Sequence, residues 1–320
     1  MKIFWKNKKV LVTGGAGFIG SYIVKELIKK NSEVTIVLSP KTKSEHLERV
    51  FGSLMNKISI EKLDLLDFNS FLKATRNQEI VLNFAAKDGG AKFKLEHSTE
   101  LFRVNTQLVL NLLESCRINK IDRVLIMSSI DVYSKNVKSP IKEEYLYLSD
   151  FDESLYGYAL SKRFSEIAAK TYYERSGLKV AIARAGNVYG PNDYSAKNKE
   201  RVIPAFIDKA RKNEDITIWG NGLQKIAFLY ITDLVSSLLD LVEKYPVGEP
   251  VNLVGSEPIS LEDLANLIIS FSKSKSKVVV GNEGGNKNRI ISIVRAKKVI
   301  GFSPKVNMKN GIETILNISK

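Results

Sequence analysis

Hydrophobic residues in the first 185 positions form short runs that alternate with amphipathic segments. The runs are rich in β-branched residues, and they are KVLVTG, EVTIVLS, KISIEKLD, EIVLNFAA, RVLIMSS and LKVAIARAG. Between the first two, GSYIVKELIKKN repeats its apolar positions with helical spacing. Strands that alternate with helices predict βαβ units, which build a parallel sheet with helices on both faces. The chain is therefore predicted to be an α/β protein with a doubly wound parallel sheet.

The pattern becomes less regular after residue 185. IPAFIDKARK and PISLEDLANLIISFS have helical spacing, ITIW is strand-like, and the tail is mixed. This change predicts a second, smaller lobe. We expect residues 1–185 to form the larger domain, with 227–254 returning to it, and residues 186–226 and 255–320 to form a C-terminal substrate-binding lobe.

A glycine-rich turn joins the first predicted strand to the first predicted helix. In TGGAGFIG, Gly14, Gly17 and Gly20 are spaced three residues apart. Glycines at such a turn let the backbone approach a pyrophosphate closely, and the start of the helix presents N–H groups to it. The same glycines also suit an ordinary turn. Because they lie between a strand and a helix, they predict a Rossmann-type dinucleotide site that includes Gly14, Ala16, Gly17, Phe18 and Ile19.

The end of the second predicted strand indicates which dinucleotide binds. NAD-binding proteins usually have Asp or Glu there for the ribose hydroxyls, whereas this chain has Ser39 and Lys41. An acid would repel a 2′-phosphate, and a serine and lysines would accept one. NADPH or NADP is therefore favoured over NAD, and the alternative is that these lysines are only solvated. Further expected cofactor contacts are Asp64, which would accept a hydrogen bond from the adenine amine, and Leu65, Ala85, Ala86 and Lys87.

The segment YGYALSK at 156–162 contains a candidate catalytic pair. Helical spacing places Tyr158 and Lys162, four residues apart, on one face, and Tyr156 cannot share that face. An ammonium group beside a phenol stabilises the ionised phenol, so that Tyr158 could exchange a proton with a developing alkoxide. A Tyr and a Lys at this spacing are more often surface residues. Here they accompany the glycine turn and the hydroxyls of MSSIDVYS at the carboxyl edge of the sheet, which favours catalysis.

Composition and charge limit the other kinds of function. The chain has 320 residues, of which 44% are hydrophobic and 26% charged, as is typical of a soluble globular protein. No apolar run approaches the roughly 20 residues that span a bilayer, so we expect a cytoplasmic protein with no membrane partner. The single cysteine, Cys116, and two distant histidines predict neither an internal disulfide nor a metal site. The net charge of +14 is spread along the chain, which favours a lysine-rich surface over nucleic-acid binding.

Taken together, these motifs resemble those of the extended short-chain dehydrogenase/reductases that act on nucleotide sugars. The resemblance covers nearly the whole chain, with RAGNVYGPND at 184–193, WGNG at 219–222 and FLYITDL at 228–234. Within the family the chain is most similar to GDP-fucose synthase, through AAKDGG at 85–90 and VIPAF at 202–206. The resemblance implies that Ser129 binds the sugar carbonyl, that Tyr158 donates a proton and that Lys162 holds the nicotinamide ribose. It implies substrate contacts from Ser129, Asp131, Asn187, Arg201, Val202, Lys225 and Arg289.

Departures from the motifs of the family narrow the expected reaction. Asp131 and Arg201 stand where GDP-fucose synthase has the cysteine and histidine with which it epimerises two carbons. A guanidinium stays protonated and is a poor acid or base for that step. Sugar-nucleotide dehydratases have Thr-Asp-Glu where this chain has SID, and Ile130 cannot protonate a leaving hydroxyl. The Arg-Glu pair that the family usually has before FLY is replaced at 226–227 by Ile-Ala, and Lys225 is the candidate to replace the lost contact.

The sequence therefore predicts an NADPH-dependent reductase that acts on the C4 ketone of a nucleotide-linked 4-keto sugar, without epimerisation at C3 or C5. A GDP-sugar is expected by likeness. One alternative is an NAD-dependent nucleotide-sugar 4-epimerase, and another is a non-catalytic dinucleotide-binding interaction protein. The family likeness also implies a homodimer that pairs helices near 99–118 and 155–175. Leu108, Leu112, Phe164 and Ala168 suit that interface, but they suit burial within the chain equally well.

Overall fold

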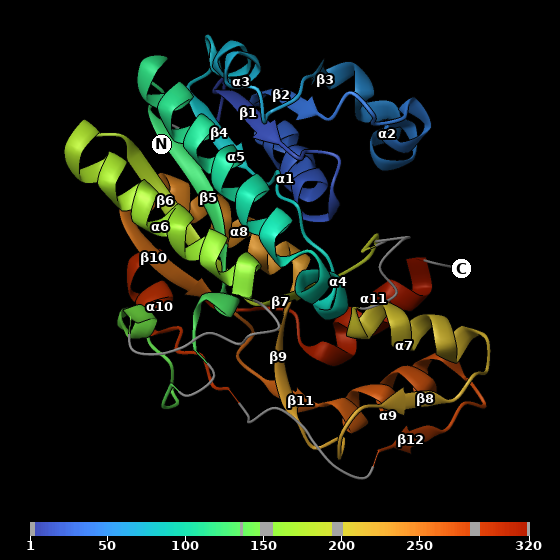
Figure 1. Cartoon of the computed structure of the whole chain (residues 1–320). Coiled ribbons are helices and arrows are strands. Elements are labelled where there is room, and N and C mark those ends of the chain that lie inside the picture. The colour runs from blue at the N-terminus through green and yellow to red at the C-terminus, as the bar shows by residue number, and fades with distance from the viewer. Residues whose placement is uncertain (1–3, 135–136, 148–155, 194–200, 282–288, 319–320) are drawn as a thin grey trace.

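A seven-stranded parallel sheet forms the centre of the larger part of the fold (Figure 1). The computed structural model describes residues 4–134, 137–147, 156–193, 201–281 and 289–318. The strand order is β10-β6-β5-β4-β1-β2-β3, and all neighbours are parallel. The strands are β1 Lys9–Thr13, β2 Glu33–Leu38, β3 Ile58–Lys62, β4 Ile80–Asn83, β5 Arg123–Ser129, β6 Lys179–Ala185 and β10 Val247–Leu253. The expected Rossmann-type α/β fold is confirmed.

Helices cover both faces of this sheet, which separates two hydrophobic cores. Successive side chains of a strand point to opposite faces, and accordingly Val10 and Val12 of β1 lie in one core and Leu11 in the other. The first core is closed by α1 Phe18–Lys29, α2 Ser44–Phe51 and α8 Ile231–Lys244; α2 leads into η1 Gly52–Lys57. The second is closed by α3 Phe68–Thr75, α5 Ser98–Ile118 and α6 Tyr156–Ser176. In Figure 1, α5 and α6 run side by side across the sheet.

The carboxyl edge of the sheet brings the predicted site segments together. β1 lies between β2 and β4, so the winding of the chain reverses there. In doubly wound sheets, ligands bind outside the carboxyl ends of the strands at this point. The glycine turn follows β1, Ser39 follows β2, Ala85 follows β4, and Ser129 ends β5. All of them therefore lie at one edge of the sheet.

The C-terminal lobe is built from two small sheets and short helices. One sheet contains β7 Asn187–Tyr189, β9 Lys225–Tyr230 and β11 Pro258–Ser260, and the other contains β8 Ile216–Ile218 and β12 Val278–Val280. The helices are α7 Val202–Arg211, α9 Leu261–Ser272 and α11 Met308–Ile318. α10 Val294–Ile300 packs against α8 and β10. α4 Ala91–Glu96 follows β4 in the sequence and packs against α5 and α6. Short 3₁₀ turns follow β5, at η2 Ile130–Val132 and η3 Glu143–Tyr147.

The segment 227–254 links the two parts. Its first residues belong to β9, which pairs with β7 and β11 in the small sheet. α8 then packs on α1, and β10 pairs with β6 at the edge of the large sheet. The return to the larger part therefore starts with α8, and the division into cofactor and substrate domains stays a proposal. Within the described residues, none of the helices has both the length and the apolar character of a membrane span.

Candidate active site

A cavity of about 630 Å³ opens at the carboxyl ends of β1, β2 and β4. Most residues expected to bind the dinucleotide line it, namely Gly14, Ala16, Gly17, Ser39, Asp64, Leu65, Ala85, Ala86 and Lys87. The lining also includes three residues that were not predicted from the sequence, Thr42, His46 and Phe84. Thr42 and His46 follow β2 closely, so counting forward from the end of that strand could have found them.

The glycine turn fits a pyrophosphate group. Gly14 has φ +64°, and a Cβ atom there would lie 2.8 Å from the carbonyl carbon of Phe84 at the end of β4. A Cβ at Gly20 would lie 2.3 Å from the carbonyl oxygen of Gly14. Only glycine allows this packing of turn, strand and helix. Gly17 begins α1 without a side-chain cap, which suits a helix start that binds an anionic group.

The part of the cavity next to β2 carries no carboxylate among the residues that line it. Those residues include Ser39, Thr42 and His46. The Nε2 atom of His46 lies 2.9 Å from the carbonyl oxygen of Ala16, and Arg49 donates to His46 Nδ1 at 3.1 Å. Because Arg49 can only donate, His46 Nδ1 accepts and Nε2–H donates to Ala16, which orients the imidazole between α2 and the glycine turn.

Four other cofactor candidates lie outside the lining of this cavity, namely Phe18, Ile19, Lys41 and Lys162, and the last of these is described below with Tyr158. Phe18 packs edge-on against Tyr22, with ring centroids 6.0 Å apart, and Ile19 packs against the first core. Lys41 is exposed, and its backbone N–H donates to Ser39 Oγ at 3.3 Å. Their contribution to binding remains a proposal. Asp64 lines the cavity, but its carboxylate already accepts a hydrogen bond from the Leu66 N–H at 3.0 Å.

The structure brings Ser129, Tyr158 and Lys162 together where β5 ends against α6. Their exposed fractions are 9%, 7% and 8%. Lys162 Nζ lies 5.5 Å from the centroid of the Tyr158 ring and donates to the Met127 carbonyl at 2.9 Å. Tyr156, in contrast, is 51% exposed. Between the two tyrosines of YGYALSK, Tyr158 is therefore the one beside the lysine.

Burial controls the acid–base properties of this pair. The pKa of Tyr158 is raised well above its ordinary value, first by burial and then by the carboxylates of Asp88 and Asp131, while a hydrogen bond with Ser129 acts in the opposite direction. Burial also lowers the pKa of Lys162 to about 8. Loss of hydration therefore determines the net direction of the Tyr158 pKa shift, and stabilisation of ionised Tyr158 by Lys162 stays a prediction.

Asp131 lies in an ion-pair cluster that the sequence analysis missed. Lys94 of α4 places Nζ 3.1 Å from Asp131 Oδ2 and 3.4 Å from Asp88 Oδ1. The same Nζ is 3.7 Å from the centroid of the Tyr158 ring. The signal was present, since AAKDGGAKFK starts at the carboxyl end of β4, but nothing in the sequence shows that α4 turns back over α6.

The remaining substrate candidates come from the C-terminal lobe and its connections. Asn187 is exposed at the start of β7, Lys225 begins β9, and Val202 begins α7. Arg201 Nη1 donates to Asp193 Oδ1 at 2.5 Å. Arg289 Nη2 donates to the carbonyls of Tyr133 and Ser134 at 3.2 and 3.4 Å. The structure thus distributes these residues over several elements, and their roles as substrate ligands remain proposals.

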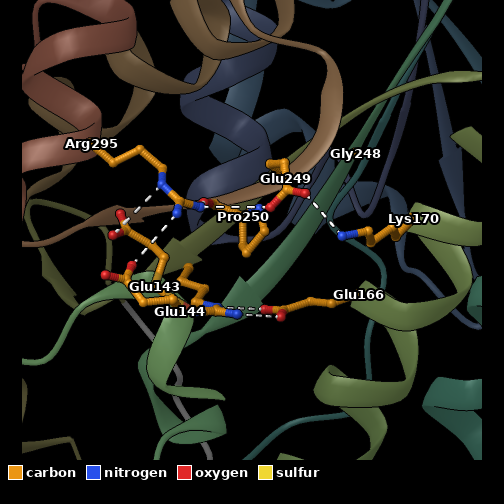
Figure 2. A pocket seen from close by; sticks show the side chains of 9 residues that line it. Glu143, Glu144, Glu166, Lys170, Gly248, Glu249, Pro250 and Arg295 are labelled. Atoms are coloured by element: carbon orange, nitrogen blue, oxygen red, sulfur yellow. Dashed lines mark hydrogen bonds and ion pairs between the residues drawn. The ribbon is translucent and has the colours of Figure 1, made fainter. Parts of the chain in front are cut away.

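A buried ion pair supports the site from behind, and the sequence analysis did not identify it. Arg184 of β6 is 1% exposed and donates to both carboxylate oxygens of Glu166 at 2.8 and 2.7 Å. Ser128, next to Ser129, donates to Glu166 at 2.5 Å. In Figure 2, Glu166 points from α6 toward the pocket that it helps to line. The volume of this pocket is about 210 Å³. On its other side Arg295 faces Glu143, Glu144 and Glu249, within 3.9 Å of each carboxylate.

The fold and the site together define a class of protein. The features of dinucleotide-dependent oxidoreductases are present: a doubly wound sheet, a dinucleotide-sized cavity on a glycine turn, and a buried Ser, Tyr and Lys where β5 ends at the carboxyl edge of the sheet. The chain belongs to the NAD dependent epimerase/dehydratase family, which matches residues 10–254.

Individual relatives act on sugars attached to different nucleotides. The chain is 33% identical to a dTDP-4-dehydro-6-deoxy-D-allose reductase of Streptomyces sp over 97% of its length and 95% of the relative. It is 30% identical to the GDP-mannose 3,5-epimerase of Arabidopsis thaliana, over 97% of this chain and 82% of that one. The structure of UDP-N-acetylglucosamine 4-epimerase from Methanobrevibacter ruminantium M1 has a TM-score of 0.85 and 26% identity, covering 98% and 99% of the two chains.

Proposed function

We propose that this protein is an NADPH-dependent reductase of the C4 ketone of a nucleotide-linked 4-keto sugar. The observation that carries the proposal is the buried group of Ser129, Tyr158 and Lys162 at the end of β5 and α6. Ser129 and Tyr158 bind the ketone oxygen, Tyr158 transfers its proton to that oxygen, and Lys162 binds the nicotinamide ribose. NADPH, when bound, supplies the hydride that adds to C4. Holding both reactants in one site lowers the entropic barrier, and the proton donor adds about 10² to 10⁴ in rate.

The preference for NADPH over NADH is proposed from the residues after β2. Ser39, Thr42 and His46 line the cavity there, and none of them is a carboxylate that would repel a 2′-phosphate. The lysines at 41 and 43 add positive charge nearby. A tightly bound NAD, which a 4-epimerase regenerates in each turnover, would instead favour an acid at this position.

The nucleotide is proposed to be GDP, on the likeness of AAKDGG and VIPAF to the motifs of GDP-fucose synthase. Asp131, Asn187, Arg201, Lys225 and Arg289 are proposed to contact the nucleotide sugar, with Val202 beside them. The relatives named above act on dTDP-, GDP- and UDP-linked compounds. A thermal-shift panel of these diphosphates with NADP present tests the base, because a ligand at 100 times its dissociation constant stabilises by about 2.7 kcal/mol.

Retention of configuration at C3 and C5 is the second part of the proposal. Inversion next to a ketone needs a base on one face and an acid on the other. Arg201 is hydrogen-bonded to the buried Asp193, and a guanidinium is a poor proton shuttle. Reaction in deuterated water should leave no carbon-bound deuterium at C3 or C5, after subtraction of exchange by the substrate alone. Inversion at either carbon would contradict this part of the proposal.

We also propose that the protein is cytoplasmic and that it forms a homodimer through α5 and α6. Leu108 and Leu112 are buried inside the chain, and Phe164 and Ala168 pack against the same core, so these four residues are used internally. The exposed apolar side chains on the two helices are instead Phe102, Leu110, Ile118 and Ile167. Light scattering should report a dimer at micromolar concentration, and Ile167→Glu should shift it toward the monomer. A monomeric unmodified protein would reject this proposal.

The direct test of the proposed function is oxidation of NADPH in the presence of 4-keto sugars that carry different nucleotides. We expect oxidation with at least one such sugar, and a preference for NADPH over NADH. Ser39→Asp should change the ratio of NADPH to NADH affinity by about tenfold in favour of NADH. A carboxylate there repels the 2′-phosphate, and a repulsion of about 1.4 kcal/mol corresponds to a factor of ten. Tighter binding of NADH than of NADPH by the unmodified protein would favour the 4-epimerase. Binding of dinucleotide without any turnover would favour a non-catalytic protein.

A further inference from the structure

The short helix α4 places a lysine over the ring of the proposed proton donor. Lys94 Nζ is 3.7 Å from the centroid of the Tyr158 ring, and 11% of the lysine side chain is exposed. A cation over the face of an aromatic ring at this distance interacts favourably with it. The same ammonium group is 3.1 Å from Asp131 and 3.4 Å from Asp88. Lys94 therefore contacts the tyrosine ring and both carboxylates beside it.

The charged groups that face Tyr158 come from several elements. Asp88 precedes α4, Asp131 lies on η2, Arg201 precedes α7, Lys94 is on α4 and Lys162 is on α6 itself. Asp88 and Asp131 raise the pKa of Tyr158, and Arg201 lowers it. Two carboxylates next to a phenol therefore oppose its ionisation.

The proposed reduction requires that ionisation. As hydride reaches C4, the O–H bond of Tyr158 breaks and its proton moves to the former ketone oxygen. The product is an alcohol, and a phenolate remains on Tyr158 until solvent returns a proton. Two uncompensated carboxylates beside this phenolate would raise the barrier, because like charges repel strongly where water is largely excluded.

We propose that Lys94 is a positioning residue for the reduction, and that its ammonium group pairs with Asp88 and Asp131 so that they oppose the phenolate of Tyr158 less than they would without it. This inference rests on the proposed function. It gives Asp131 a role as the partner of Lys94 rather than as an independent base. It also explains why two lysines of α4 have different surroundings. Lys94 is 11% exposed and pairs with two carboxylates beside Tyr158, whereas Lys92 is 76% exposed. Among the described residues, the one ion pair of Lys92 is with Glu96, one turn away on the same helix, at 3.8 Å.

Variants of Lys94 test the effect of this charge on the reaction. Lys94→Met should lower kcat by about 10- to 100-fold, where each factor of ten is 1.36 kcal/mol of transition-state stabilisation. KM for NADPH should change little, because Lys94 does not line the cofactor cavity. Lys94→Arg keeps the charge and can stack on the ring, so it should retain most of kcat. Lys92→Met is the matched control on the same helix and should behave as the unmodified protein.

A double variant separates charge from simple structural support. Removing Asp131 in the background that lacks the lysine eliminates a carboxylate that has lost its partner. At saturating sugar, so that any loss of sugar binding does not enter, kcat of Lys94→Met/Asp131→Asn should therefore be about tenfold higher than that of Lys94→Met alone. If Lys94 only supported the structure, removing Asp131 as well would not restore any activity. A kcat of the double variant that is equal to or lower than that of Lys94→Met would therefore overturn the proposal.

A readout that does not depend on turnover distinguishes the failure of this inference from the failure of the proposed function. Lys94 lowers the pKa of Lys162, and Asp131 raises it. NMR titration of ¹³C-labelled lysines should show that the pKa of Lys162 rises in Lys94→Met and falls back in the double variant. An unchanged pKa of Lys162 in Lys94→Met would overturn the role of Lys94, whether or not the protein reduces a sugar. If the pKa of Lys162 changes as expected in both variants but the protein reduces no 4-keto sugar, the proposed reduction is rejected instead.

Discussion

Two charged groups lie one turn apart on α6, and their surroundings differ in a way that separates structure from chemistry. Glu166 is 4% exposed and is fully paired, through two hydrogen bonds from Arg184 and one from Ser128. Lys162 is 8% exposed and donates to the uncharged carbonyl of Met127. The first group has its charge neutralised within the core, and the second keeps a charge that forms no ion pair with a carboxylate among the described residues.

This difference indicates what each group does. A buried ion pair with all its hydrogen bonds made holds β5, β6 and α6 together but adds little net stability compared with apolar packing. A buried charge with partial compensation destabilises the fold, and such groups are found where a binding site or reaction needs them. We therefore propose that Glu166 and Arg184 support the site and that Lys162 belongs to the site itself.

The largest effect is expected from removal of the proton donor. Tyr158→Phe should lower kcat by about 10² to 10⁴, because the phenol is lost while the ring remains packed. Tyr156→Phe is the matched control on the same helix, since its side chain is 51% exposed, and it should retain nearly full activity. Steady-state kinetics with both variants makes the comparison. An equal loss of kcat in the two would show that the wrong tyrosine had been assigned.

Disruption of the supporting pair should act on stability rather than directly on the chemistry. Glu166→Gln leaves the guanidinium of Arg184 buried without its counter-charge, and we expect the free energy of unfolding to fall by about 3 to 5 kcal/mol. Glu174→Gln, on the same helix and 49% exposed, should change it by less than about 1 kcal/mol. Urea denaturation followed by circular dichroism measures both. A stability loss in Glu166→Gln no greater than that of the control would contradict the comparison.

Replacement of Lys162 should change the stability in the opposite direction and raise the free energy of unfolding. Burial lowers the pKa of Lys162 from 10.5 to about 8, so at neutral pH its charge destabilises the fold by up to about 3 kcal/mol. Lys162→Met should therefore unfold at a higher temperature than the unmodified protein while losing activity. Lys170→Met, with a lysine that is 47% exposed, is the control.

The pH dependence gives this prediction a second check. Between pH 8 and 10.5 the unfolded chain binds more protons at Lys162 than the folded chain does, so the stability of the unmodified protein rises with pH in this window. The advantage of Lys162→Met is fully present below this window and should shrink as the pH rises through it. If Lys162→Met is less stable than the unmodified protein at neutral pH, the interactions of the Lys162 ammonium group outweigh the cost of burying its charge, and the prediction is wrong.

Although β10, VGEPVNL, was expected only as part of the returning segment 227–254, most of the large sheet was predictable because β1 to β6 are each marked by a local hydrophobic run. The same holds for the glycine turn and for Tyr158 and Lys162, where spacing along the chain decides the geometry. The small sheets of the lobe were mostly missed, because strands such as β7 and β11 are three residues long and are stabilised by partners distant in sequence.

Contacts between distant residues explain what the sequence could not show about the site. Lys94 and Asp131 are 37 positions apart, and Arg184 and Glu166 are 18 positions apart. The net direction of the Tyr158 pKa shift could not be predicted from the sequence for a related reason. Proximity of a lysine follows from helical spacing, whereas the degree of burial follows from how α4, α6 and β5 pack together.

The most direct test of the account is the fate of the hydride. The protein should be incubated with a nucleotide-linked 4-keto sugar and NADPH that carries deuterium at the transferred position of the nicotinamide, and the product examined by mass spectrometry and NMR. The account predicts deuterium bound to C4 of the sugar, together with stoichiometric formation of NADP. A sugar product without deuterium at C4, or interconversion of C4 epimers with no net oxidation of NADPH, would contradict it.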